Sequence, residues 1–365
     1  MILPFNKEPC SVGCKETQIL LSWRIQPEVN GNMDQPPLRL VAHHVLQHYP
    51  FGAHHLTALG NHGGFTGARL WRLQGDGGAF CLRAWPASDP SQDRLRWIHN
   101  LMGRARDEGL QFVPAICRTR DGQTFVESAG RLWELTTWMP GQADFHSRAS
   151  LPRLESACEA LARLHNAWER IDARLGPCPA IERRLSRAAQ WRALVKSGWS
   201  PSFSGAGREI FRDVAEQAWR LLRSWADRVP TALAPWSGKS FALQPCLCDI
   251  WHDHVLFDRD SVRGVIDFGS VKIDHVCVDL ARLLGSLVSD DSERRKIGIV
   301  GYRRHRRLTD EEGRLVDVLD QTGAIIALEA WLRWVYLEQK PLEAPHLAAE
   351  RLGGLVQRVE QWQRD

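Results

Sequence analysis

The spacing of hydrophobic and polar residues changes at about residue 140 of the 365-residue chain. Before that point, short runs alternate between apolar and polar positions and are separated by glycine-rich turns, which is typical of β-strands. After it, apolar residues mostly recur every three or four positions, as on one face of a helix. The pattern predicts an α+β protein of two lobes, a small β-rich N-lobe over residues 36–139 and a larger, mainly helical C-lobe over residues 140–365.

Residues 1–35 have no sustained period, and turn formers such as Asn30-Gly31-Asn32 lie among them, so we expect a weakly ordered N-terminal extension there. The N-lobe pattern predicts a helix, a strand, a glycine-rich loop, two strands joined by a hairpin turn, a second helix and three further strands. These elements are expected at 38–46, 55–59, 60–67, 68–73, 79–85, 91–106, 112–118, 124–127 and 132–139.

The C-lobe pattern predicts helices at 151–168, 181–197, 207–228, 276–289, 310–339 and 345–363. One stretch, from Cys246 to Leu287, departs from it. There Asp249 ends an apolar segment, and 18 residues later Asp267 ends a short β-type run. Two such carboxylates suit phosphoryl transfer, in which one orients a hydroxyl group and the other holds a metal ion on the phosphates. Two ordinary hairpin loops would also place aspartates at these positions.

Two features of the N-lobe fit the same chemistry. The loop over residues 60–67 holds four glycines, which let a backbone approach a phosphate closely and direct its amides at it. A plain glycine-rich hairpin has the same composition. Arg83 lies in the expected third strand, where a kinase-type site needs a cation. Arginine in a strand is more often a surface side chain, so both interpretations of Arg83 stay open.

Composition limits the classes of function. The net charge is only +4, and the densest basic run, residues 303–307, has a helical context, so no nucleic-acid partner is expected. Nine scattered cysteines indicate reduced thiols, and no zinc-type pair of motifs occurs. Without a long apolar run or a secretory leader, we expect a cytoplasmic protein with no membrane partner. Tryptophans between 191 and 236 would suit either an acceptor pocket or core packing.

The motif around the two aspartates resembles the aminoglycoside phosphotransferase and choline kinase-like enzyme family, and the similarity extends from about Leu56 to Leu287. That family shows His-Gly-Asp, four residues, Asn, an apolar triplet, a turn, and Ile-Asp-Phe or Ile-Asp-Trp. The corresponding residues here are Leu247-Cys248-Asp249, His254, Val255-Leu256-Phe257 and Val265-Ile266-Asp267-Phe268. Asp279-Leu280-Ala281 likewise resembles the family's Asp-Leu-Ala.

The resemblance implies a protein-kinase-like fold and transfer of the γ-phosphoryl group of ATP to a hydroxyl of a small molecule. It implies that Asp249 is the catalytic base, that Asp267 is the principal magnesium ligand and that Asp279 is a structural support. The residues that it implies for nucleotide binding are Gly63, Gly64, Phe65, Thr66, Arg83, Thr137 and Met139, the last two in the hinge between the lobes. His165, which follows an apolar helical run, is interpreted as structural.

The chain departs from the family pattern at three positions of the motif. Leu247 and Cys248 replace His-Gly, so the loop that enters Asp249 is built differently. His254 replaces the Asn that would offer the metal an oxygen. Because imidazole suits softer ions than Mg²⁺, Mn²⁺ is an alternative metal, and His254 could instead hold a metal-bound water or contact a phosphate.

The expected α-helix at 91–106 has no Glu to pair with Arg83, and Asp93 is the nearest substitute. The competing hypothesis to an active kinase is a non-catalytic module that kept the fold to bind a nucleotide or a partner.

Overall fold

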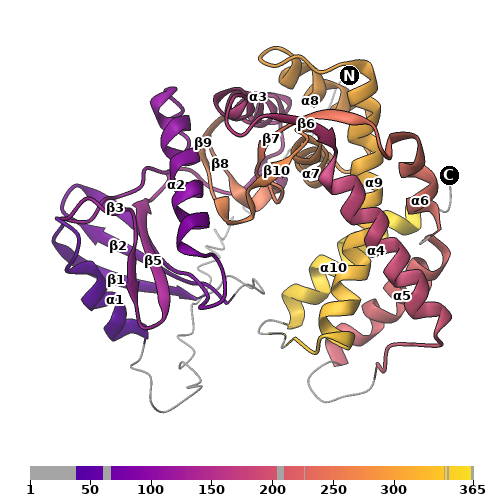
Figure 1. Ribbon diagram of the computed structural model, residues 1–365, viewed down its shortest axis with the longest axis horizontal. Helices are drawn as coiled ribbons and strands as arrows, with labels where there is room; N and C mark the ends of the chain where they lie inside the picture. The colour runs from indigo at the N-terminus through magenta and orange to yellow at the C-terminus, as the bar shows by residue number, and fades with distance from the viewer. Residues whose placement is uncertain are drawn as a thin grey trace, which may run out of the picture.

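The computed structural model describes residues 38–60, 67–203, 209–225, 227–340, 342 and 345–362. Figure 1 shows a β-sheet lobe with its helices on one side of the molecule and a mainly helical lobe on the other. The predicted α+β architecture is therefore confirmed. Within these ranges no helix has the length and apolar character needed to span a membrane. The predicted extension at 1–35 and loop residues 61–66 lie outside the description.

The first lobe is built on a five-stranded antiparallel sheet with the strand order β1-β2-β3-β5-β4. Helix α1 packs its apolar side into the core of this sheet, where Trp71 stacks on Trp133. Helix α2 begins at Ser91, whose hydroxyl caps the amide of Arg94, and it lies toward the second lobe (Figure 1). The bounds are α1 (Leu38–Leu46), β1 (Ala53–Gly60), β2 (Arg69–Gly75), β3 (Gly78–Ala84), α2 (Gln92–Asp107), β4 (Val126–Ser128) and β5 (Arg131–Thr137).

The strand predicted at 112–118 is wrong. This segment forms only a single bridge, between Ile116 and Thr136, and the strand predicted at 124–127 is the short β4. Phe112 and Val113 bury their side chains in the core of the second lobe, and the carbonyl of Phe112 accepts a hydrogen bond from Val265. Their apolar pattern thus reflects burial against helices, while Pro114 has no amide to give a sheet.

The second lobe is mainly helical, as predicted, and its six predicted helices are all present with ends shifted by a few residues. Helices α6 and α8 were not predicted, and α9 gives way to a π-helical turn at Arg333–Leu337. The helices are α3 (Leu151–Trp168), α4 (Pro179–Lys196), α5 (Glu209–Trp225), α6 (Arg228–Leu233), α7 (Cys277–Val288), α8 (Ser292–Arg303), α9 (Asp310–Leu332) and α10 (Pro345–Gln361).

The strands in and beside the stretch from Cys246 to Leu287 belong to two small sheets. One has the order β10-β7-β6 and the other is the β8-β9 hairpin. Asp249 follows β7 by three residues, and Asp267 follows β9 by two. The strands are β6 (Arg174–Pro177), β7 (Ser240–Cys246), β8 (Val255–Asp258), β9 (Ser261–Val265) and β10 (Lys272–Asp274).

The tryptophans between 191 and 236 belong largely to the helical core. Trp191 and Trp219 are buried and meet edge to face, with ring centroids 5.4 Å apart, and Trp199 packs against both. Trp225 and Trp236 are also buried in this core. The packing interpretation of these residues is therefore the one that the structure favours over an acceptor pocket.

Candidate active site

Four of the predicted site residues lie together where the two lobes meet. Arg83, on β3, donates a hydrogen bond from Nη1 to Oδ1 of Asp267 over 3.2 Å, although 184 residues separate them. Nε2 of His254 lies 3.7 Å from Oδ2 of Asp267, and Nδ1 of the same ring lies 2.8 Å from the backbone oxygen of Asp249. The fold therefore brings Arg83 of the sheet lobe close to the loops that carry Asp249 and Asp267.

Asp267 occupies a left-handed backbone conformation, with φ of +63°, directly after β9. Burial acts to raise the pKa of its carboxyl group, but Arg83 and then His254 lower it more, so the net pKa lies below its usual value. The carboxylate is therefore ionised at neutral pH. Its side chain is still 45% exposed, and such hard anionic oxygens are the ligands that Mg²⁺ prefers.

Arg83 is held from its other side by Glu134, its cross-strand neighbour on β5. Nε of Arg83 lies 3.6 Å from Oε1 of Glu134, and Oε2 of Glu134 lies 2.6 Å from Nε2 of His99 on α2. Burial acts to raise the pKa of Glu134, but His99 and then Arg83 bring it below its usual value. Trp85 lies under the guanidinium, with its ring centroid 4.7 Å from Cζ.

Asp93, the substitute partner proposed for Arg83, was the wrong carboxylate. It pairs with Arg96 at 2.9 Å on the surface of α2, and its side chain is 97% exposed. The true partner, Glu134, comes from β5, and α2 contributes His99 in place of an acid. A signal was present in the sequence, because Glu134 stands between Trp133 and Leu135 in an otherwise apolar strand. A carboxylate at such a position is rarely buried without a partner.

The hydrogen bonds of His254 define the role of each ring nitrogen. Nδ1 faces the backbone carbonyl of Asp249, which can only accept, so Nδ1 carries the proton. Nε2 accepts a hydrogen bond from Nε1 of Trp251 over 2.9 Å. The electron pair of Nε2 therefore points at an indole N–H. His254 could ligate a metal through Nε2 only after Trp251 gives up this hydrogen bond.

Asp249 lies on the opposite side of His254 from Asp267. Its Oδ1 accepts a hydrogen bond from Nη2 of Arg282 over 3.2 Å, and both side chains are 45% exposed. Arg282 comes from α7, and sequence reasoning did not identify it. The contact places a cation beside the carboxylate without burying either group.

A buried network fixes the loop that leads to Asp249. The amides of Leu247 and Cys248 each donate to one carboxylate oxygen of Asp279 over 2.6 Å. Cys248 itself has a left-handed conformation, with φ of +62°. The replacement of His-Gly by Leu-Cys thus leaves the loop anchored, and Asp279 has the structural contacts expected of it.

His165, Cys246 and Asp279 have metal-type ligand atoms within 4.8 Å of one another. Hydrogen bonds within the protein already occupy these atoms. His165 donates from Nε2 to Asp279 over 3.0 Å and accepts from the hydroxyl of Tyr302 over 2.7 Å, and burial lowers its pKa so that the ring is neutral. Burial raises the pKa of Cys246 well above its usual value, and the thiol donates to the carbonyl of Asp274. The cluster is a hydrogen-bonded support.

The predicted hinge residues lie at the end of β5. The amide of Thr137 donates to Ala115, and its hydroxyl accepts from the amide of Ala115, each over 2.9 Å. Met139 is buried. Since Thr137 already uses its amide and hydroxyl, an adenine edge would need other backbone groups of the hinge. Gly63, Gly64, Phe65 and Thr66 lie outside the described residues.

Comparison with known proteins agrees with this geometry. The phosphotransferase enzyme family model matches residues 57–315. A homoserine kinase of Gluconacetobacter diazotrophicus is 30% identical over 262 residues, which cover 68% of this chain and 72% of that protein. A homoserine kinase of Beijerinckia indica is 27% identical over 292 residues, 78% of this chain and 83% of that protein.

Solved structures show the same fold at low sequence identity. Spectinomycin phosphotransferase in complex with ADP and spectinomycin superposes with a TM-score of 0.67 at 11% identity, covering 88% of this chain and 98% of that one. Amicoumacin kinase in complex with AMP-PNP and Ca²⁺ gives 0.63 at 12% identity, with 89% and 93% covered. The predicted family resemblance is confirmed. The chain belongs to the phosphotransferase enzyme family and is an ATP-dependent small-molecule kinase that phosphorylates a hydroxyl group.

Proposed function

We propose that the acceptor is homoserine, whose terminal hydroxyl receives the γ-phosphoryl group of ATP. The support comes from the homoserine kinases above, which the chain matches over most of their length. The observation that carries the proposal for the site is the meeting of Arg83, Asp267, His254 and the Asp249 loop within hydrogen-bonding or ion-pairing reach of one another.

In this proposal Asp249 is the catalytic base. The acceptor oxygen forms a bond to the γ-phosphorus as the bond to the ADP oxygen breaks, and the hydroxyl proton passes to the carboxylate of Asp249. Since catalysis of this transfer consists mainly of alignment and charge neutralisation, an oriented carboxylate suffices. Arg282 positions Asp249 from α7 through its contact with Oδ1.

Asp267 and Arg83 are proposed to serve the nucleotide. The ionised, partly exposed carboxylate of Asp267 fits a divalent ion, and Mg²⁺ is the expected metal, with Mn²⁺ as the alternative. A bound ion of this kind neutralises charge on the phosphate oxygens. His254 would join as a second ligand only where Trp251 leaves its Nε2. The remaining nucleotide contacts are proposed for Gly63, Gly64, Phe65, Thr66, Thr137 and Met139.

The proposal is tested by measuring ADP release with homoserine, 3-aminopropan-1-ol, serine and threonine as acceptors, and by identifying the product with phosphorus NMR. We expect O-phosphohomoserine with the highest kcat/KM. Asp249→Asn should lower kcat about a thousandfold, within the range for a lost general base and orienting group, with ATP affinity unchanged. Full activity of this variant would refute the role of Asp249, and turnover of another acceptor in preference to homoserine would refute the substrate.

A further inference from the structure

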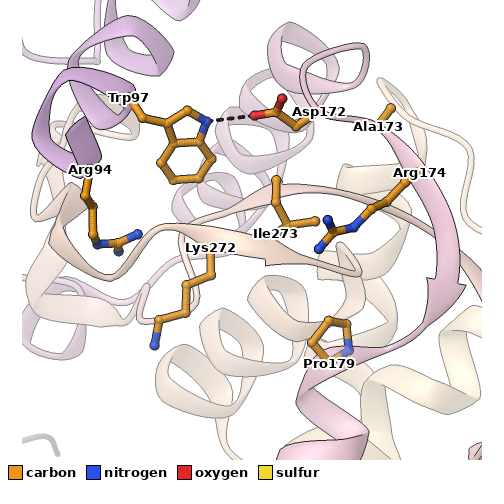
Figure 2. Close-up of a pocket in the computed structure, with 8 residues that line it drawn as sticks. All are labelled: Arg94, Trp97, Asp172, Ala173, Arg174, Pro179, Lys272 and Ile273. Atoms are coloured by element: carbon orange, nitrogen blue, oxygen red, sulfur yellow. Dashed lines mark hydrogen bonds between the residues drawn. The ribbon is translucent and has the colours of Figure 1, made fainter.

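A recess of about 730 Å³ opens between α2, the start of α4 and the two outer strands of the β10-β7-β6 sheet (Figure 2). We call it the basic recess. Figure 2 shows three basic side chains around it, Arg94 on α2, Lys272 on β10 and Arg174 on β6. Trp97, Asp172 and Ile273 also line it.

The charges in the basic recess are unbalanced. Three cations line it against one carboxylate, that of Asp172, which accepts a hydrogen bond from Nε1 of Trp97 over 2.8 Å. Arg174 and Lys272 are exposed, and among the residues that the structure describes neither has a carboxylate within ion-pair distance. Like charges gathered in one concavity repel one another, so a bound anion would lower their energy.

The densest basic run of the chain, in contrast, has carboxylate partners. In residues 303–307, Arg303 pairs with Asp310 and Arg304 with Glu155, each over 2.7 Å. Those charges are offset by carboxylates of the protein itself. Basic side chains of this run are thus paired within the protein, whereas Arg174 and Lys272 of the basic recess have no such partner among the described residues.

The basic recess adjoins both loops of the candidate active site. Nη2 of Arg94 donates to the carbonyls of Gly269 and Val271, over 3.1 and 2.8 Å, in the loop that directly follows Asp267. Lys272 pairs across the sheet with Cys246, three residues before Asp249. Arg94, which lines the recess, thus connects α2 to the segment that carries the proposed metal ligand.

We propose that the basic recess binds the oxyanion group of a small molecule, a carboxylate or a phosphate. An oxyanion held by Arg94, Arg174 and Lys272 would join α2 to β10 and β6, and so steady the loop that carries Asp267. Arginine and lysine are the side chains that recognise such groups by charge-assisted hydrogen bonds. None of the nucleotide-binding residues proposed above lines the recess, so this is a second anion site.

The experiment is calorimetric titration of the full chain with inorganic phosphate, with the nucleotide site filled by AMP-PNP and Mg²⁺. We expect binding that weakens with added NaCl, because exposed charges are screened by salt. Lys272→Ala with Arg174→Ala should weaken it at least about tenfold, equal to about 1.4 kcal/mol. The matched control is Lys296→Ala, which removes an exposed lysine that pairs with Glu293 on α8 and should leave binding unchanged.

A second measurement distinguishes the two possible sources of the oxyanion, the acceptor itself or a separate molecule. Only this measurement rests on the proposed function. If the recess takes the carboxylate of homoserine, phosphate should compete with homoserine. Lys272→Ala should then raise KM for homoserine and not for 3-aminopropan-1-ol, which lacks the carboxylate. If a separate molecule is bound, phosphate and homoserine should bind independently.

No phosphate binding, or binding that AMP-PNP abolishes or that the double variant leaves unchanged, would overturn the proposal. The titration needs no turnover, so phosphate binding through Lys272 by a chain inactive on homoserine would count against the proposed acceptor alone.

Discussion

The two carboxylates of the candidate site are equally exposed, at 45%, but the cations that bind them lie in contrasting surroundings. Asp267 is bonded to Arg83, which is backed by Glu134 and His99, whose side chains are only 8% and 2% exposed. Asp249 has the contact with Arg282, in which both side chains are 45% exposed. Buried ion pairs are costly to break, whereas exposed pairs contribute little. The half of the site that is proposed to bind the nucleotide is therefore fixed in advance by the protein, and the half proposed to bind the acceptor is left for the substrate to complete.

Removing the carboxylate charge of Asp267 should have the largest effect. In Asp267→Asn we expect kcat/KM to fall about a thousandfold or more, as for loss of a group that stabilises transition-state charge, together with the metal dependence of ATP binding. Steady-state kinetics and titration of ATP with and without Mg²⁺ check this. Asp93→Asn is the matched control, because that exposed carboxylate pairs only on the surface of α2. Metal-dependent binding by Asp267→Asn would remove Asp267 from the role of ligand.

Breaking the support behind Arg83 should have the next largest effect. Glu134→Gln leaves Arg83 and His99 facing a neutral group, which should lower the free energy of unfolding by about 3 kcal/mol and raise KM for ATP. Urea denaturation and steady-state kinetics measure the two effects. A variant with normal stability and normal KM for ATP would show that the buried network does not hold the nucleotide cation.

The stability difference between wild type and Glu134→Gln should depend on pH. Because the folded-state pKa of Glu134 lies below its ordinary value of 4.5, its ionised form stabilises the protein above pH 4.5. That contribution is lost as the pH falls through the folded-state pKa. The stability difference between wild type and Glu134→Gln should therefore be constant from pH 7 to about 5 and shrink below that. A difference that grows on acidification would contradict the assignment.

This contrast also explains which residues the sequence revealed. Asp249, His254 and Asp267 were found because a short motif holds them at fixed spacing. Arg83 was found from its place in the order of elements. Glu134 and His99 were missed, because their contact with Arg83 depends on the register of β3 against β5 and on the side of α2 that faces the sheet.

Helix α2 by itself offers Asp93 as a partner for Arg83, and that side chain points to solvent. Arg282 reaches Asp249 from a helix 33 residues further on, and no local pattern predicts that approach. Contacts between distant parts of the sequence also explain the error in the predicted fold. The apolar run at 112–118 has the composition of a strand, yet it is buried by helices that its own sequence cannot indicate.

Removing the cation of the acceptor half should have a smaller effect than breaking the buried network. Since the pair of Arg282 with Asp249 is exposed and screened, Arg282→Ala should change stability by less than about 1 kcal/mol. We expect kcat to fall about fivefold, as Asp249 loses one orienting contact, with KM for ATP unchanged. Arg282→Lys should restore part of this loss. An effect on kcat as large as that of Asp249→Asn would mean that Arg282 contacts the reacting groups directly.

The smallest effect concerns the loop that enters Asp249, where Cys248 holds a left-handed conformation that favours glycine. Cys248→Gly and Cys248→Ala both remove the thiol, but only glycine also removes the backbone strain, so their comparison isolates it. The strain of a side chain there costs roughly 1–2 kcal/mol, part of which glycine returns through the greater freedom of its unfolded chain. We therefore expect the glycine variant to be about 1 kcal/mol more stable than the alanine variant in urea denaturation, with equal KM for ATP. Equal stability would mean that the hydrogen bonds of Leu247 and Cys248 to Asp279 define this loop whatever residue precedes Asp249.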